Sequence, residues 1–452
     1  MSQDAEAAGT ARDVADKRSW QDIGRTLDLD TRLLGMLVAI GVIWVGFNVM
    51  SDGSFITSRN LWNLSVQSTS IAVMATGMVL IIVTRNIDLS VGSLLGLLGY
   101  TMALVQTQGM ISVFGVDFTI DGLKGQWFTW IVALAVGLAL GAVIGVIQGS
   151  LIAYVGVPAF IVTLGGYLAW RGLIFRTGGQ QGQTLAPLND TFRYLGGAPE
   201  RSLGDWKSWL LALLMCGGIV ITLVLARRRR QRHELPVRPL GVDIGIGVAG
   251  CILVLLFVWG IAIRYESPVT GDPVGVAYPV LILIGVTALM TYLARRRRFG
   301  RYVYAYGGNP EAAELGGINT RRTVMLTFVL MGMLCAVSGA IQTARLNSAT
   351  TNLGIQNELD VIAAAVIGGT SFSGGIGTIP GAVLGAVVMQ SLRSGMSLLN
   401  IDSPTQDIVV GIVLVTAVAI DSLLRQRKTS WVFGALGVGV FVAGVVIQTG
   451  RP

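Results

Sequence analysis

"TRNIDLSVGSLLG", residues 84–96, interrupts an apolar run that otherwise extends from Ile71 to Val105. Arg85 and Asp88 stand three residues apart in a stretch long enough to cross a bilayer. A charged side chain at the centre of a bilayer costs about 2.5–3.5 kcal/mol on insertion scales, so such residues are rare there. The interruption predicts two membrane helices, with residues 85–90 forming a short turn between them at or near one membrane surface.

The composition is that of a polytopic membrane protein. Of the 452 residues, 52% are hydrophobic and 13% are charged, whereas a soluble domain carries about 25% charged residues. A bilayer core takes about 20 apolar residues per helix, and the fold class is therefore an all-α membrane helix bundle of about 11 to 13 transmembrane segments. The predicted spans are 33–50, 66–84, 91–108, 129–154, 159–175, 208–226, 242–263, 277–294, 323–345, 405–424 and 431–448.

Two glycine patterns predict how these helices pack. Gly137, Gly141, Gly145 and Gly149 recur every four residues, which places them on one helix face where backbones approach closely. The second pattern is "GGTSFSGGIGTIPG", residues 368–381, which follows an apolar stretch at 360–372 that is too short for an ordinary span. Because irregular backbone at membrane depth occurs only inside protein or along a cavity, this region predicts a broken helix.

The basic residues predict the orientation of the chain. Residues 1–32, 85–90, 227–240, 295–322 and 425–430 hold 22 of the 33 lysines and arginines. Positive residues favour the cytoplasmic side, so the N-terminus is predicted inside, with residues 1–32 as a polar cytoplasmic tail. The net charge of +8 fits arginines beside anionic membrane lipid, and no soluble domain remains to bind nucleic acid.

The sequence contains no machinery for driving transport by itself. It lacks a phosphate-binding loop of the form G-x-x-x-x-G-K-[ST], and its spans lack a relay of carboxylates and histidines. The acidic candidates in the apolar core are Asp88, Glu358 and Asp360. We therefore predict that the chain is not an enzyme and binds no metal or cofactor of its own. If it is a transporter, it takes its energy from a partner. An ion-coupled secondary transporter remains the alternative.

The longest inner loop suggests where a partner would bind. "RRRRFGRYVYAYGGNPEAAELGGINTRR", residues 295–322, has basic clusters at both ends and small residues between them. Asn309 can cap a short helix, Pro310 suits its first position, and Glu311 suits its positively polarised first turn. These features predict either a rigid knob for another protein or a solvated loop with a turn of helix.

Three segments together resemble one family. "EAAELGG" (311–317) is similar to the loop by which permease subunits of ABC importers contact their ATPase. "NIDLSVGS" (86–93) and "GGTSFSGGIGTIPGAVLGA" (368–386) resemble two signatures of the ribose/xylose-type sugar permeases. The resemblance covers most of residues 33–425, and the basic stretch within 227–298 brings it nearest to the xylose type. It implies a permease domain at 33–426 with a coupling loop at 295–322. The polar N-terminal tail and an extra C-terminal membrane segment at 427–452 depart from the family pattern.

The resemblance also implies function and partners. The chain would be a permease of the bacterial plasma (inner) membrane that imports a monosaccharide by alternating access, with a pentose such as xylose favoured. Its partners would be an ATP-binding subunit that carries ATP and Mg, an extracytoplasmic sugar-binding protein, and a second permease copy in a homodimer or a different permease subunit in a heterodimer. An ABC permease for a different small polar solute is the other alternative.

The candidate site residues fall into two groups. Either Asp88 or Ser90 caps the next helix, or Asp88 contacts the transport pathway. Arg85 is either a membrane-face anchor or an ion-pair partner of Asp88. The predicted contacts with the ATPase are Asn309, Glu311, Ala312, Ala313 and Gly317. The predicted pathway or helix-break residues are Asn86, Asp88, Ser90, Gly92, Ser93, Gly369, Thr370, Ser371, Ser373, Gly374 and Gly375.

Overall fold

The computed structural model describes residues 31–113, 116–120, 122–177, 183–233 and 239–426. The predicted tail before Thr31 and the predicted last span, 431–448, lie outside these residues. In chain order the elements are α3 (Thr31–Met50), α4 (Ser58–Val83), α5 (Val91–Gln108), β1 (Met110–Val113), β2 (Val116–Thr119), α6 (Thr129–Ser150), η1 (Leu151–Val155), α7 (Ala159–Arg176), η2 (Phe192–Gly196), η3 (Pro199–Arg201), α8 (Asp205–Arg232), α9 (Leu240–Phe257), η4 (Val258–Ile263), α10 (Tyr278–Arg296), α11 (Arg298–Gly308), α12 (Pro310–Leu315), α13 (Thr320–Leu346), α14 (Asn357–Ile367), α15 (Ile379–Leu398) and α16 (Ser403–Gln426).

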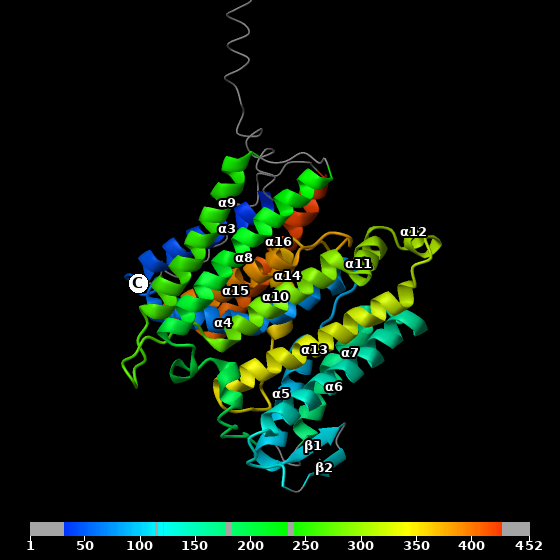
Figure 1. Ribbon diagram of the computed structural model, residues 1–452. Helices are drawn as coiled ribbons and strands as arrows, with labels where there is room; N and C mark the ends of the chain where they lie inside the picture. The colour runs from blue at the N-terminus through cyan, green and yellow to red at the C-terminus, as the bar shows by residue number, and fades with distance from the viewer. Residues whose placement is uncertain (1–30, 114–115, 121, 178–182, 234–238, 427–452) are drawn as a thin grey trace, which may run out of the picture.

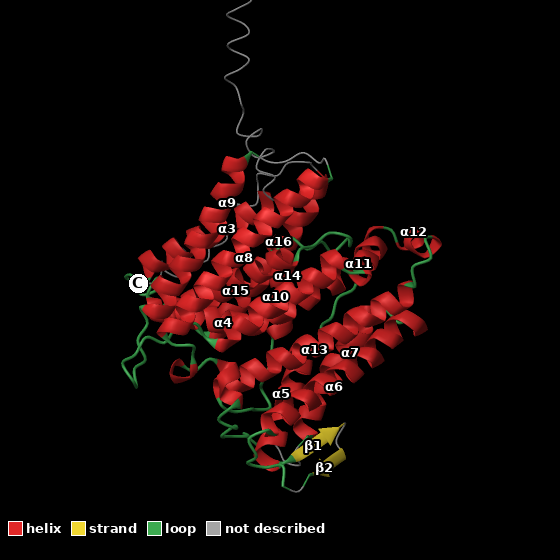
Figure 2. Ribbon diagram, in the orientation of Figure 1, coloured by secondary structure: helices red, strands yellow, loops and turns green. Residues whose placement is uncertain are grey.

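The chain is a polytopic membrane helix bundle, as predicted (Figure 2). Among the described residues, six helices are long and apolar enough to cross a bilayer by length and composition: α4, α6 with η1, α8, α9 with η4, α10, and α13. The predicted bounds of α5 agree with the structure, and those of α7 and α10 differ by one or two residues. The length of an apolar segment predicts these helices well because the thickness of the bilayer core sets the length of a membrane helix.

Three local features differ from the sequence prediction. α4 begins at Ser58, well before residue 66, because the Thr57 hydroxyl accepts a hydrogen bond from the Asn60 amide and caps the helix. α8 continues to Arg232 through the arginine run that was predicted as a loop. Long arginine side chains can leave the lipid while their backbone stays helical. β1 and β2 form an unpredicted antiparallel hairpin with Met110 opposite Thr119.

α4 and α5 form the centre of the bundle. Almost every residue of both helices is buried, and both pack against α13. Figure 1 shows α5, α6, α7 and α13 together below α4, α10 and α15. The hydroxyls of Ser70 on α4 and Ser338 on α13 lie 2.6 Å apart, which satisfies polar groups inside the apolar interior.

The predicted glycine face joins α6 to α13. Gly141 lies against Gly332, Gly145 against Phe328 and Gly149 against Met325, and each approach is too close for a side chain on the glycine. Gly137 continues the same face toward Met102 of α5. The glycines allow close contact between the two backbones, as predicted. Membrane helices associate through such packing because the hydrophobic effect does not drive them together in lipid.

α8 and α9 form an apolar pair at the edge of the bundle (Figure 1). Only Ser208 and Ala212 of α8 and Gly247 of α9 are buried. Leu213 and Leu253 are 69% and 62% exposed. Such continuous apolar surface suits contact with lipid rather than water.

α14, α15 and α16 are held together by a largely buried ion-pair network. The carboxylate of Asp360 on α14 accepts two hydrogen bonds from Arg393 on α15, at 2.8 and 3.0 Å. Arg393 also lies 3.4 Å from the carboxylate of Asp407 on α16. Asp360 is only 3% exposed, so its charge depends on this partner. The pair connects the two helices that flank the 368–378 break.

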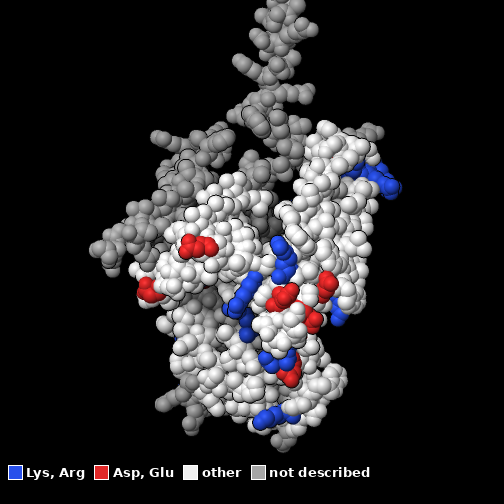
Figure 3. Space-filling view, turned by 90° about the vertical axis from the view of Figure 1, so that its left-hand side faces the viewer, with Lys and Arg blue, Asp and Glu red and all other residues white. Residues whose placement is uncertain are grey.

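The loops at one end of the bundle are tied to one another. Leu185 pairs with Ala349 and Gly204 with Gly275 across short backbone bridges. Hydrogen bonds and charge from Arg201, with help from Arg193, hold the pKa of the Asp190 carboxyl below its usual value. Figure 3 shows acidic and basic side chains close together on the face that lies at the left of Figure 1. α12 lies toward the opposite side of the bundle.

Candidate functional site

α12 is a short exposed helix with the predicted cap. The Asn309 side chain accepts a hydrogen bond from the Ala312 amide at 3.0 Å, and Pro310 takes the first helical position. Glu311 is exposed in the first turn, and Ala313 alone is buried against the protein. Ala312 is exposed beside Glu311, and Gly317, at φ +77°, turns the chain toward α13. The helix therefore exposes one side to solvent while Ala313 packs against the protein.

Leu315 is a feature of α12 that the sequence analysis overlooked. It is the last residue of the helix and is 90% exposed. An isolated exposed leucine is ordinary, but this one lies beside Glu311 on the segment predicted to contact an ATPase. Its place inside the "EAAELGG" motif was the signal that would have identified it.

Three segments that are distant in sequence meet beside α12. We call this contact the loop junction and define it as residues 83–86, 304–308 and 374–377. The Gly375 amide donates to the Val83 carbonyl at 3.0 Å, and the Tyr304 hydroxyl donates to the Gly377 carbonyl at 2.8 Å. Burial raises the pKa of the Tyr304 phenol, with Arg295 opposing the effect, so Tyr304 remains a donor at neutral pH. The junction brings the end of α4 and the α14–α15 break into contact with α11.

Arg85 makes the central polar contacts of the junction. Its Nε donates to the Gly307 carbonyl and its Nη2 to the Gly308 carbonyl, both at 2.9 Å. The predicted pairing of Arg85 with Asp88 is wrong, because these donors are directed to the end of α11 instead. Asn86 turns back on Thr84, two residues earlier, and its side-chain nitrogen donates to the Thr84 carbonyl at 3.0 Å.

Asp88 is buried and organises the turn before α5. It is 1% exposed, and its Oδ1 accepts from the Ser90 amide at 2.9 Å and the Ser90 hydroxyl at 2.7 Å. Ser90 takes the N-cap position, as predicted, but its side chain makes no capping hydrogen bond, and Asp88 accepts from Ser90 itself. The Ser90 hydroxyl is engaged by Asp88 and by Gln148 of α6, whose amide nitrogen lies 3.0 Å away. The burial also shows that the predicted surface turn reaches solvent at Arg85 but not at Asp88.

The first turn of α5 packs against the start of α14. A side chain on Gly92 would collide with the Glu358 carboxylate and the Gly354 carbonyl. Glu358 is 8% exposed, and its Oε2 has no hydrogen-bond partner. The Ser93 hydroxyl instead donates to the Ser90 carbonyl at 2.9 Å. The first turn of α5 and residues 354–358 at the start of α14 therefore meet inside the bundle.

The 368–378 break is a compact turn that is partly satisfied by its own groups. The Ser371 amide donates to the Ile376 carbonyl at 2.9 Å, and the hydroxyls of Ser371 and Ser373 lie 2.9 Å apart. The Thr370 hydroxyl is buried without a hydrogen-bond partner. Gly369, Gly374 and Gly375 have φ values of +87°, +84° and +73°, which allow the turn to reverse. The structure thus contains the predicted break between α14 and α15.

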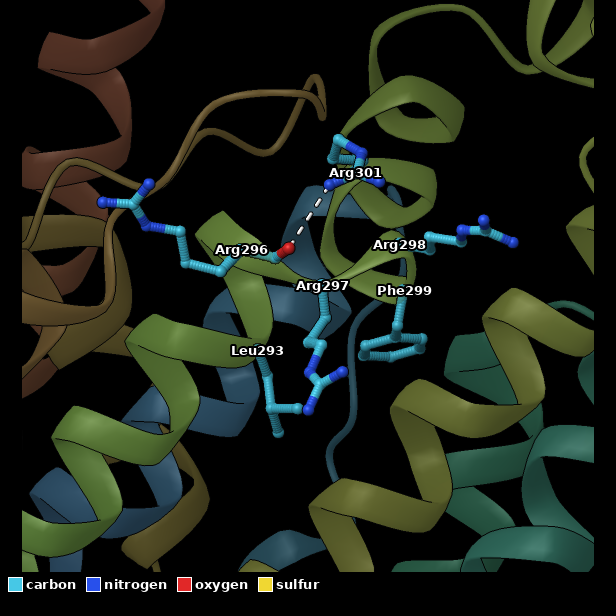
Figure 4. A pocket seen from close by; sticks show the side chains of 6 residues that line it. All are labelled: Leu293, Arg296, Arg297, Arg298, Phe299 and Arg301. Carbon is cyan, nitrogen blue, oxygen red and sulfur yellow. Dashed lines mark hydrogen bonds between the residues drawn. The ribbon is translucent and has the colours of Figure 1, made fainter. Parts of the chain in front are cut away.

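A cavity of 560 Å³ lies where α10 meets α11 (Figure 4). The guanidinium groups around it point in different directions. Arg301 donates to the Arg296 carbonyl at 3.3 Å, and Arg297 lies over the Tyr292 ring. The charges do not converge on one ligand, so the cavity does not resemble a sugar site. Its lining residues are Leu293, Arg296, Arg297, Arg298, Phe299 and Arg301.

The described residues contain no cluster of three or more His, Cys, Asp or Glu side chains that could hold a metal ion. The arrangement instead consists of an exposed helix, a hydrogen-bonded junction behind it, and two interrupted helices beyond. Such a chain of contacts can transmit movement from the surface into the bundle.

Comparisons with known proteins point to transport. Residues 60–418 match the family described as branched-chain amino acid transport system/permease component. The chain is 37% identical over 393 residues to the xylose transport system permease protein XylH of Haemophilus influenzae, covering 87% of this chain and 96% of that protein. It is 35% identical over 402 residues to XylH of Escherichia coli K12, covering 88% and 94%. It is 32% identical over 390 residues to the ribose import permease protein RbsC of the same strain, covering 86% and 92%. No solved structure matches the chain.

Proposed function

The chain belongs to the family of branched-chain amino acid transport system/permease components, and from this premise we propose that it is the membrane-spanning permease of an ATP-driven sugar importer. It receives a monosaccharide from a soluble binding protein and releases it into the cytoplasm by alternating access. The relatives named for xylose and ribose support a sugar, and the higher identity to the xylose permeases favours a pentose such as xylose.

The observation that carries this proposal is the exposed α12 on its hydrogen-bonded junction. A member of a transport family that has no nucleotide-binding motif takes its energy from a partner protein. The exposed surface of α12 offers a binding site for that partner. Exposed Glu311 and Leu315 provide one charged and one apolar contact. Ala313, which is buried, anchors the helix from behind. A separate ATP-binding subunit, carrying ATP and Mg, binds here in the proposal.

The mechanism follows the contacts inward from α12. When the ATP-binding subunits close, they displace α12 together with the end of α11. The loop junction passes this movement to the α4–α5 turn and to the α14–α15 break. Because helices at these breaks lack continuous backbone hydrogen bonds, they can tilt at lower cost than intact helices. The transport pathway opens and closes around them.

The remaining parts of the proposal concern assembly and location. The permease lies in the bacterial inner membrane with its N-terminus in the cytoplasm and pairs with a second copy of itself. Residues 33–426 make up the permease domain, 295–322 its coupling loop, and 427–452 an extra membrane segment. The binding protein docks at the end formed by the 183–204, 264–277 and 347–356 loops. Asp88, Ser90, Thr370 and Ser371 support the breaks beside the pathway.

Reconstitution tests this function directly. We expect the chain to accumulate xylose in liposomes only with ATP, an ATP-binding subunit and a sugar-binding protein encoded by neighbouring genes. Glu311→Lys should abolish uptake and weaken ATPase association while the protein still folds, because it reverses a charge on the exposed face of α12. Glu200→Lys, an exposed acid on a distant loop, is the matched control for ATPase association.

Two results would contradict the proposal. Normal uptake by the Glu311→Lys variant would remove α12 from the coupling role. Concentrative uptake with an ion gradient and no ATPase would instead show an ion-coupled secondary transporter. Accumulation of another small polar solute, with no response to sugars, would keep the ATP-driven class and change the substrate.

A further inference from the structure

The backbone and side chain of Arg85 adopt an unusual arrangement. Its φ is +62°, in the left-handed region that non-glycine residues seldom occupy. This conformation lets the chain turn directly after α4, and it sends the side chain toward α11. Such a conformation costs free energy, and it persists only where contacts with the surrounding structure hold it in place. Here the surroundings are two carbonyl groups and a glycine turn.

The guanidinium contacts differ from those of a membrane-face anchor. An anchor would extend toward lipid headgroups or water, whereas Nε and Nη2 of Arg85 each donate to a backbone carbonyl of α11. These carbonyls belong to the last residues of α11, where unsatisfied oxygens and the helix dipole favour a cation. The planar fork of arginine suits two adjacent acceptors, and lysine has no equivalent geometry.

The same side chain also contacts the α14–α15 break. A carbon placed on Gly374 would lie 2.5 Å from Arg85 Cγ and 2.7 Å from the Gly307 carbonyl oxygen. Gly374 has φ +84°, and the next residue, Gly375, donates to the Val83 carbonyl. The stem of Arg85 therefore lies between the break and the end of α11.

We propose that Arg85 is a positioning residue that couples α12 to both helix interruptions, so that the three segments move as one unit. The inference rests on the proposed transport function. Asn309 follows Gly308 directly and caps α12, so Arg85 holds the base of the helix that the partner grips. Without this link, the partner could move α12 while the α4–α5 turn and the break stayed behind. Arg85 touches neither the sugar nor ATP in this role.

The test uses the full chain and measures the link and the coupling separately. Arg85→Gln should raise amide hydrogen exchange of residues 303–317 by about tenfold, as expected for losing hydrogen bonds from a charged donor. In liposomes with ATP, the ATP-binding subunit and the sugar-binding protein, it should lower sugar uptake by about tenfold while ATP hydrolysis continues. Arg85→Lys should give intermediate values in both. Arg59→Gln, an exposed arginine at the other end of α4, should change neither.

Each outcome decides one part of the inference. Unchanged exchange in Arg85→Gln would overturn the link. Raised exchange with an unchanged ratio of sugar to ATP would overturn its role in coupling. If Arg85→Gln does not fold, the same two readings on Arg85→Lys decide both parts. If the unaltered chain transports no sugar with its ATPase and the sugar-binding protein, the proposed function fails, and the exchange measurement still decides whether Arg85 links the segments.

Discussion

Gly307→Ala would place one methyl group where α11 meets the end of α4. The added carbon would lie 2.0 Å from the Val83 carbonyl oxygen and 2.6 Å from the Gly375 nitrogen. Carbon–oxygen contacts normally measure about 3.3–3.6 Å, so the two backbones must separate by more than about 1 Å. This movement would break the Gly375–Val83 hydrogen bond and weaken the hydrogen bonds from Arg85 to the end of α11.

The expected cost follows from these contacts. Overpacking costs about 1–3 kcal/mol, and a lost hydrogen bond costs about 0.5–1.5 kcal/mol. Alanine in place of glycine returns up to about 1 kcal/mol through its higher helix propensity. We therefore expect a net destabilisation of about 1–3 kcal/mol. The neighbouring Gly308→Ala is the matched control, because a carbon there meets nothing within 4 Å, and it should be neutral or slightly stabilising.

Chemical denaturation of the purified chain in detergent measures both variants, and liposome uptake measures the consequence for coupling. Gly307→Ala should unfold at lower denaturant concentration than Gly308→Ala and should transport less sugar per ATP. If the two variants were equally stable and equally active, the close approach at residue 307 would be refuted. The transmission route through the loop junction would then lose its main packing contact.

Two further predictions concern the helix bundle. Arg393→Leu should destabilise the chain by about 3–5 kcal/mol, because it leaves Asp360 buried without its partner; adding Asp360→Asn should recover part of the loss, and equal stability of the single and double variants would contradict this account. Gly332→Ala should destabilise by about 1–3 kcal/mol, because the added carbon would lie 2.0 Å from the Gly141 carbonyl oxygen. Gly165→Ala, with open space around it, should not destabilise the chain, and a similar loss in both would argue against a tight α6–α13 contact.

The helices and their close contacts were largely predictable from the sequence. The bounds of α5 and the break after α14 follow from apolar length and from glycine and hydroxyl residues. The face of Gly141 and Gly145 follows from a spacing of four residues. These properties depend on neighbours within a few residues of one chain segment, so the sequence contains them directly.

The functions of individual polar residues were less predictable. Asp88 or Ser90 was expected to cap α5, yet the Ser90 hydroxyl donates to Asp88 and contacts Gln148 of α6. Arg85 was expected at a membrane face or beside Asp88, yet its donors reach Gly307 and Gly308, more than two hundred residues later in the chain. No local sequence pattern predicts these partners, because such hydrogen bonds form between segments that only the folding of the whole chain brings together.

By itself, the sequence determined the membrane class, most of the spans, the glycine contact face and the cap of α12. Each depends on apolar length, residue spacing or a cap within one turn of helix. Only the tertiary structure decided that 84–90, 304–308 and 374–377 form one junction and that Arg85 lies at its centre. "TRNIDLSVGSLLG" predicts an interruption between two helices, but the partners of its charges are chosen by packing across the whole bundle.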